Sequence, residues 1–152
     1  MVITLASYAQ VYKMYSTRNY HNQLRLNTMT GEVQQIQDDG QSWIICSARE
    51  ISGDKESRFC LYETQNMWTF ILLDSYNGRL WQVQYSTQDL DNLFCIPINK
   101  DELGSDNEKC IFSIQPLTSM YQYYLINDRT GDMWKFQWST KGDDYRWIEK
   151  FK

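Results

Sequence analysis

Hydrophobic and polar positions alternate along most of the chain, and turns that contain glycine interrupt this alternation at regular intervals. The clearest stretch is 67–85, where two runs rich in β-branched and aromatic residues flank Asn77 and Gly78. These two residue types tolerate the positive φ that a tight hairpin turn needs. The stretch therefore predicts a β-hairpin. Similar turns precede Gly31 and Gly131, which predicts two further hairpins.

Three repeat units align without a gap from their first strand to their third, with Tyr12, Phe59 and Phe112 at one shared position. The offsets between units are 47 residues (59 minus 12) and 53 residues (112 minus 59). Each unit predicts four antiparallel strands. The second strands are expected at 20–27, 67–74 and 120–127, the third at 32–38, 79–85 and 132–138, and the fourth at 42–46, 93–98 and 145–151. The units span about 8–50, 55–100 and 108–152 of one domain, 1–152.

A period near 50 residues with four strands per unit is typical of a β-propeller blade, and it is also the size of a β-trefoil unit. Short links, together with a tryptophan three residues after the turn glycine (Trp81 and Trp134), favour the blade. We therefore expect an all-β fold. Its three meanders would close with approximate threefold symmetry as a three-bladed propeller, and a β-trefoil is the alternative. Propellers usually have at least four blades, so three must close tightly or two chains must share one ring.

The two hairpins that carry these tryptophans are LDSYNGRLW (73–81) and INDRTGDMW (126–134). They resemble the "LD-x-x-TG-x-x-W" hairpin of propeller-type repeat proteins, a pattern also seen in small uncharacterised bacterial proteins. The resemblance covers about a third of each unit and implies architecture without implying an activity.

One face of the third strand is apolar in the second and third units, because alternate residues of a strand point to opposite faces. The apolar positions are Trp81, Val83, Tyr85, Trp134, Phe136 and Trp138, and the polar ones are Gln82, Gln84, Lys135 and Gln137. We expect Trp81 and Trp134 to be buried and equivalent.

The first unit departs from this pattern on both its second and its third strand. At the apolar positions it carries a mostly polar set, which consists of His21, Gln23, Arg25, Gln34, Ile36 and Asp38. Antiparallel pairing across the Gly31 turn brings these residues alongside one another. Either the first unit is a solvent-facing cap, as terminal repeats often are, or Arg25 and His21 meet a partner or ligand there.

A second candidate feature is a glutamine at the same position of every unit: Gln37, Gln84 and Gln137. If the polar face of the third strand looks toward the threefold axis, the three amides form a polar ring that binds a small ligand. Alternation also places ordinary solvent-facing residues at these positions.

Composition excludes several classes of partner. A net charge of -4 and a pI near 4.9, without a run of Lys or Arg, argue against nucleic acid. The longest apolar run, 68–73, is too short to cross a bilayer, so no membrane association is expected. The segment 1–9 lacks the basic start and the apolar length of an export signal, which predicts a mature cytoplasmic chain.

Four cysteines and one histidine argue against metal binding. Cys46, Cys60, Cys95 and Cys110 include no Cys-x-x-Cys pair, and a single histidine does not complete a zinc site. No metal or other cofactor is expected. Thiols are the favoured state of the cysteines in a cytoplasmic chain, whereas export would favour the disulfides Cys46–Cys60 and Cys95–Cys110.

Signals of catalysis are few, since the chain lacks a Gly-x-Ser-x-Gly elbow, a glycine-rich phosphate loop and a Cys-His spacing. We therefore expect no catalytic residues. The expected function is a non-enzymatic module, monomeric or homodimeric, that binds a protein through the polar surface of the first unit. Binding of carbohydrate or another small polar ligand is the alternative, and a hydrolase that uses turn carboxylates is the third choice. A lectin should repeat its contact residues in every unit, whereas this polar surface occurs once.

Overall fold

Each of the three units folds into its own four-stranded antiparallel meander. The computed structural model describes residues 10–105 and 111–152, so the segment 1–9 and Cys110 lie outside the described residues. Sheet 1 contains β1 (Tyr12–Ser16), β2 (Asn22–Asn27), β3 (Val33–Gln37) and β4 (Ser42–Cys46). Sheet 2 contains β5 (Phe59–Glu63), β6 (Thr69–Asp74), β7 (Leu80–Gln84) and β8 (Phe94–Pro97). Sheet 3 contains β9 (Phe112–Pro116), β10 (Gln122–Asn127), β11 (Met133–Gln137) and β12 (Trp147–Lys150). The all-β prediction with three repeated meanders is confirmed.

The central hairpin of every sheet turns at the predicted glycine. Gly31, Gly78 and Gly131 have φ values of +79°, +76° and +78°, in the left-handed region that glycine adopts without a steric penalty. In the first hairpin, Gly31 N donates to Asn27 O at 2.9 Å, and Asn27 Oδ1 accepts from Met29 N at 3.0 Å. The asparagine therefore completes the turn that the glycine permits.

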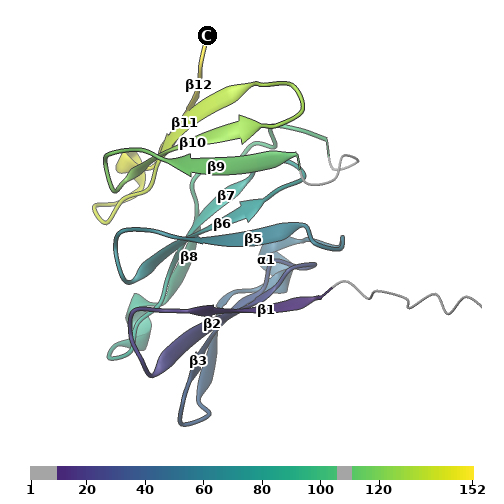
Figure 1. Cartoon of the computed structure of the whole chain (residues 1–152). Coiled ribbons are helices and arrows are strands. Elements are labelled where there is room, and N and C mark those ends of the chain that lie inside the picture. Colours follow the sequence, from purple (N-terminus) through teal and green to yellow (C-terminus); the bar gives the residue numbers. More distant parts are fainter. Residues whose placement is uncertain (1–9, 106–110) are drawn as a thin grey trace, which may run out of the picture.

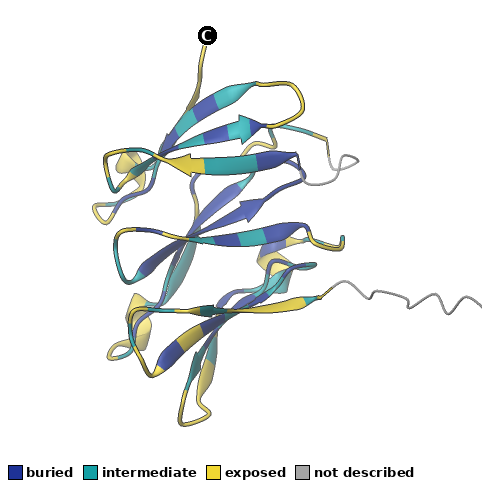
Figure 2. Cartoon of the chain, viewed as in Figure 1, coloured by how far each residue is buried: buried dark blue, intermediate teal, exposed yellow. Residues whose placement is uncertain are grey.

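The three sheets lie one above another, with sheet 1 at the bottom of the view, sheet 2 in the middle and sheet 3 at the top (Figure 1). Sheet 2 is covered on both faces, and every residue of β6 is buried (Figure 2). Leu72 belongs to the core cluster that sheet 2 shares with sheet 1. Its neighbour Ile71 points to the other face and belongs to the cluster shared with sheet 3. The core is therefore divided into two layers that share sheet 2.

This double coverage corrects one expectation about the faces of the third strand. Gln82, expected on a polar face, is fully buried. Its amide Nε2 donates to Ser139 O at 3.0 Å, and Ser139 N donates to Gln82 Oε1 at 3.2 Å. The polar residue is accommodated because sheet 3 satisfies both ends of its amide.

The two tryptophans of the repeat are buried and equivalent, as predicted. Trp81 and Trp134 are 4% and 7% exposed. Phe59 lies against Trp81 with a centroid distance of 6.4 Å, and Phe112 lies against Trp134 at 5.9 Å, both with an interplanar angle of 54°. Each inter-sheet layer thus contains one tilted aromatic pair of the kind that stabilises protein cores.

The two core clusters show which sheets pack against each other. One core cluster joins sheets 1 and 2 and the other joins sheets 2 and 3. Within residues 10–105 and 111–152, no core cluster joins sheet 1 to sheet 3, so closure about a threefold axis stays a prediction. A trefoil is not the observed arrangement, because the strands of each unit form a separate sheet.

Short helical segments follow β4 or precede the last strand of a sheet, and sequence reasoning did not anticipate them. They are α1 (Ala48–Ile51) and two 3-10 turns, Leu90–Asn92 and Asp143–Tyr145. Ser47 caps α1, since its side chain accepts a hydrogen bond from Glu50 N at 3.2 Å.

A buried ion pair joins the segment before β5 to the hairpin turn of sheet 2. Arg58 Nε donates to both carboxylate oxygens of Asp74, at 2.9 and 3.0 Å, and Arg58 Nη2 donates to one of them at 2.7 Å. Both side chains are nearly inaccessible to solvent, at 4% and 2%. Tyr76 N also donates to Asp74 Oδ1 at 3.0 Å. The fork-shaped contact from Arg58 therefore fixes how the chain enters sheet 2.

Two of the cysteines meet between sheets 1 and 2. Cys46 and Cys95 are free thiols, and burial together with a hydrogen bond to Cys95 raises the pKa of Cys46 well above its usual value. The neighbour of Cys46 is thus Cys95, rather than Cys60 as the export interpretation proposed. A buried thiol of this kind behaves as a small apolar core residue.

Candidate functional site

The mostly polar set predicted from the first unit lies together on the outer face of sheet 1. Strand pairing places Arg25 opposite Gln34 and Gln23 opposite Ile36. At the end of these strands, Asp38 N donates to the carbonyl oxygen of residue 21 at 3.1 Å. We call this surface the head face. It consists of Tyr12, Met14, His21, Gln23, Arg25, Gln34, Ile36, Asp38 and Ile44.

Arg25 is held at the middle of the head face. Its Nη2 donates to Gln34 Oε1, and its guanidinium carbon lies 5.3 Å from the centroid of the Tyr12 ring. Gln34 Nε2 in turn donates to Glu32 Oε1 at 3.3 Å. Stacking on an aromatic ring and donating to an amide both orient a guanidinium, so its charge is presented in a defined direction.

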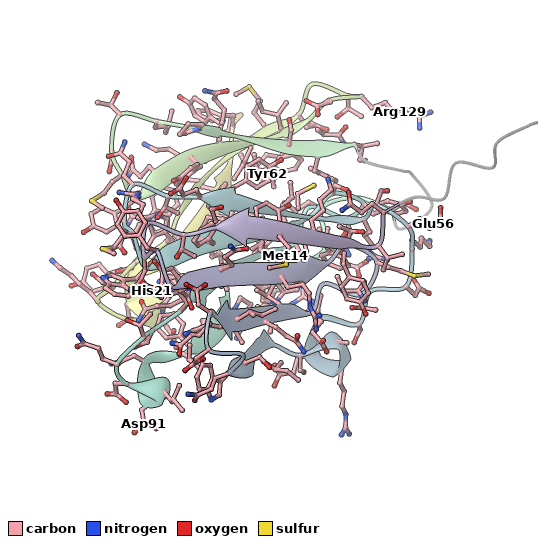
Figure 3. All side chains as sticks on the ribbon, turned by 60° about the horizontal axis from the view of Figure 1, so that its bottom comes forward. Met14, His21, Glu56, Tyr62, Asp91 and Arg129 are labelled. Atoms are coloured by element: carbon pink, nitrogen blue, oxygen red, sulfur yellow. The ribbon has the colours of Figure 1, made fainter. Side chains whose placement is uncertain are left out.

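Exposed apolar side chains surround this arginine. Tyr12 and Met14 are each 51% exposed, and Ile44 is 55% exposed. Met14 lies near the middle of the head face and His21 toward one end, as Figure 3 shows with the bottom of the molecule turned forward. Aromatic residues, methionine and arginine are the residue types enriched in protein-binding surfaces, and exposed apolar side chains gathered on one face often mark such a surface.

His21 and Asp38 replace an aromatic pair that the other units keep. His21 Nδ1 lies 2.9 Å from Asp38 Oδ2, with both side chains largely exposed. The equivalent rings pack together in the other units: Trp68 with Tyr85 at 5.2 Å, and Tyr121 with Trp138 at 4.8 Å. The departure from the repeat therefore extends to the end of the head face.

Of the three glutamines proposed as an axial ring, Gln84 and Gln137 make side-chain hydrogen bonds within their own units, and Gln37 makes a backbone one. Gln84 Nε2 donates to Asn92 O at 3.1 Å, and Gln137 Nε2 donates to Tyr145 O at 3.0 Å. Gln37 N donates to the carbonyl oxygen of residue 41 at 2.9 Å. Across the described part of the chain, no hydrogen bond connects one of these glutamines to another.

Sequence reasoning missed a second recurring glutamine, two residues earlier on the third strand. Gln35 Nε2 donates to Ser86 O at 2.6 Å, and Ser86 N donates to Gln35 Oε1 at 3.3 Å. The Gln82 and Ser139 pair repeats this arrangement between sheets 2 and 3. We call each pair an amide clamp. The signal was present in the sequence, because Gln35 and Gln82 occupy one repeat position.

Two equivalent pockets open beside the loops that follow β7 and β11. The first has a volume of about 300 Å³ and is lined by residues that include Trp68, Gln84 and Tyr85. The second has a volume of about 210 Å³, and its lining includes Tyr121, Gln137 and Trp138. Aromatic walls beside an amide occur in pockets for small polar ligands. Unit 1 carries His21, Gln37 and Asp38 at the matching positions.

Within 10–105 and 111–152, no group of three or more His, Cys, Asp or Glu side chains is arranged to hold a metal ion. The same part of the chain contains no helix with the length and apolar character of a membrane span.

Comparison of the chain with protein-family models, curated proteins and solved structures finds no match. The head face and the two repeated pockets are therefore the features of the molecule that point to a function.

Proposed function

We propose that the protein is a non-enzymatic binding module whose head face docks a protein partner. The observation that carries the proposal is the uncovered apolar surround of Tyr12, Met14 and Ile44 around the fixed guanidinium of Arg25. Tyrosine and arginine are enriched among the residues that dominate binding energy at interfaces. The partner presents a carboxylate or amide to Arg25 and apolar side chains to the surround.

We further propose that each of the three sheets corresponds to one blade of a propeller. The partner then lies beside sheet 1, in the place of the next blade. The repeat supports this assignment, because Tyr12 and Arg25 occupy the positions of Phe59 and Leu72, which face sheet 1 from sheet 2. The ring would therefore close only when the partner supplies the surface that this one chain lacks.

Capture of the partner, followed by titration, tests this function. The chain is used to isolate binding proteins from native lysate, and the affinity of each is then measured by calorimetry. Arg25→Ala should weaken binding by about 1–3 kcal/mol, the value of a charge-assisted hydrogen bond. The melting temperature should change little, because the head face contributes no core packing.

The matched control is Arg49→Ala, an exposed arginine on α1 away from the head face. It should leave the affinity unchanged. If binding survives the combined Arg25→Ala and His21→Ala change, the first unit is a solvent-facing cap and the proposal is wrong.

A second candidate function is binding of a carbohydrate or a similar small polar ligand in the two equivalent pockets. The repetition of an aromatic pair and a glutamine in sheets 2 and 3 favours it. A glycan array followed by tryptophan fluorescence titration tests it. Trp68→Ala and Tyr121→Ala should each lower the stoichiometry from two sites to one. Absence of any glycan that changes the fluorescence would reject this candidate.

A further inference from the structure

The contact between neighbouring sheets occurs twice in the chain with the same construction. Phe59 N donates to Thr28 O at 2.9 Å across the first boundary, and Phe112 N donates to Ser75 O at 3.0 Å across the second. The first strand of each following sheet is therefore hydrogen bonded to the hairpin turn of the sheet before it.

The same phenylalanines also cover the turn glycines. A Cβ atom added to Gly31 would lie 3.0 Å from the ring of Phe59, and one added to Gly78 would lie 3.0 Å from the ring of Phe112. The amide clamps complete each boundary. Three independent features thus recur at both boundaries: a strand-to-turn hydrogen bond, a ring over a glycine and an amide clamp.

Each end of the stack carries one half of this boundary. On sheet 3, Asp128 and Gly131 occupy the positions of Ser75 and Gly78. Among the described residues other than its chain neighbours, no atom lies within 4 Å of where a Cβ of Gly131 would be. On sheet 1, Tyr12 occupies the position of Phe59 and is 51% exposed. A ring and the glycine that it would cover are therefore both uncovered, at opposite ends of one chain.

The outer face of sheet 3 is also apolar. Its apolar residues occupy the repeat positions by which sheets 1 and 2 pack against the sheet that follows them. Tyr124, Ile126 and Met133 take the repeat positions of Ile71, Leu73 and Leu80, and all three are half-buried. We call this surface the tail face. It consists of Tyr124, Ile126, Met133, Lys135, Glu149 and Phe151.

Charge at the two ends is complementary as well. At the clamp positions the tail face has Lys135 where Gln35 and Gln82 occur, and sheet 1 has Asp39 where Ser86 and Ser139 occur. The register of β11 and β12 places Glu149 beside Lys135, so the tail face also offers a carboxylate to an arginine.

We propose that the head face of one copy docks on the tail face of a second copy of this chain. The proposal rests on the proposed function and names the partner of that site. Tyr12 covers Gly131 of the second copy, and Asp39 meets Lys135. The contact is heterologous, so it produces either a closed ring of copies or an open filament, depending on the rotation between them.

Sedimentation velocity over a concentration series up to the solubility limit tests the proposal. The wild-type chain should associate. Tyr12→Lys, which blocks the head, and Met133→Lys, which blocks the tail, should each weaken association at least about 10-fold, as loss of a central interface residue does. Tyr20→Lys is the matched control, because Tyr20 is 94% exposed and lies in the turn between β1 and β2, off both faces. It should leave association unchanged.

Mixing the two blocked variants gives the sharpest result. The head-blocked chain keeps its tail and the tail-blocked chain keeps its head, so an equimolar mixture should form a one-to-one complex although each chain alone stays monomeric. This result also shows that both variants are folded. A symmetric head-to-head dimer predicts no complex in the mixture, and that outcome overturns the proposal.

A charge exchange adds an independent measurement. Asp39→Lys and Lys135→Asp should each weaken association about 2- to 5-fold, the effect of an exposed ion pair, and the double variant should recover it.

Failure here is distinguishable from failure of the proposed function. A wild-type chain that stays monomeric while Arg25→Ala weakens capture of another protein overturns the second-copy proposal and leaves the binding function standing. A chain whose association depends on the tail variant but not on Tyr12 overturns the second-copy proposal alone, and both proposals fail only if Arg25→Ala also leaves capture of other proteins unchanged.

Discussion

Gln35 and Ser86 form a two-way contact across the boundary between sheets 1 and 2, in which the amide of one side chain satisfies both backbone groups of the other residue. Both residues are buried, so neither backbone group has water as an alternative partner. The pair connects sheets that share no strand hydrogen bonds. It thereby sets how the two sheets are registered against each other.

Replacing the glutamine of a clamp should destabilise the fold. Gln35→Leu is expected to cost about 1–3 kcal/mol, because it leaves a buried N–H and a buried carbonyl without partners. Gln82→Leu should cost a similar amount, because it removes the acceptor of Arg146 Nε (2.7 Å) while Ser139 O keeps a hydrogen bond from Arg146 Nη2 at 3.0 Å. Urea unfolding measures both. Gln115→Leu, on the exposed end of β9, is the control and should change stability little. Equal stability of all three variants would contradict a role for the clamp.

Truncating either core tryptophan should be costly at both boundaries. Trp81→Ala and Trp134→Ala are expected to cost about 3–5 kcal/mol each, as large-to-small changes in a packed core do. Trp147→Ala, at a half-buried position on β12, should cost clearly less. A urea midpoint that does not move in Trp134→Ala would show that this ring does not support the second boundary.

The buried ion pair of sheet 2 predicts a strong effect from a nearly isosteric change. Asp74→Asn removes the carboxylate that accepts the shortest hydrogen bonds of the buried Arg58 guanidinium, and among the described residues the exposed Asp54 carboxylate remains at 3.5 Å. We expect a loss on the order of 3 kcal/mol, because a buried charge that loses its partner keeps its desolvation cost. Asp54→Asn is the control and should cost little, because the Asp54 side chain is 78% exposed although it faces the same arginine. Thermal and urea unfolding of the two variants, measured side by side, would reveal equal losses if the ion pair were unimportant.

Stability should fall at alkaline pH partly through Tyr62. Burial raises the pKa of Tyr62 to about 12, with smaller contributions from Cys60, Tyr15 and Asp128. The unfolded chain has an ordinary tyrosine pKa near 10, so it releases this proton first. The stabilisation is therefore complete below pH 10 and is lost as the pH rises toward about 12.

Tyr62→Phe isolates this contribution. The urea midpoint of the variant should fall less steeply than that of the wild type between pH 10 and about 12. Tyr20→Phe, at a fully solvated position, should follow the wild-type curve. Parallel curves for wild type and Tyr62→Phe would contradict the raised pKa.

The strands and turns were predictable because their causes are local. Alternation fixes which side chains share a face, and Gly31, Gly78 and Gly131 supply the φ values that the hairpins need. The burial of Gln82 was not predictable from its own unit, since it depends on which sheet packs against β7. Alternation distinguishes two faces, but it does not show that a neighbour will cover both.

The candidate site was predictable only in its polar part. His21 and Arg25 differ from the aromatic and aliphatic residues at the same repeat positions, so the comparison of units finds them. Tyr12 and Met14 are large apolar residues, like Phe59 and Leu61 at the same repeat positions. In the sequence they therefore resemble core residues. Their exposure follows from the absence of a sheet beside sheet 1 in the described chain, which no local pattern records.

The burial of sheet 2 on both faces has a consequence for synthesis on the ribosome. Leu24 and Leu26, on the inner face of sheet 1, have their packing partners Phe70 and Leu72 on sheet 2. Those partners emerge about one repeat later, so the inner face of sheet 1 stays uncovered for roughly 2–10 s at a synthesis rate of 5–20 residues per second. The second face of sheet 2 likewise stays uncovered until sheet 3 is synthesised. The nascent chain therefore always carries one uncovered sheet, and only the finished chain has both layers of its core.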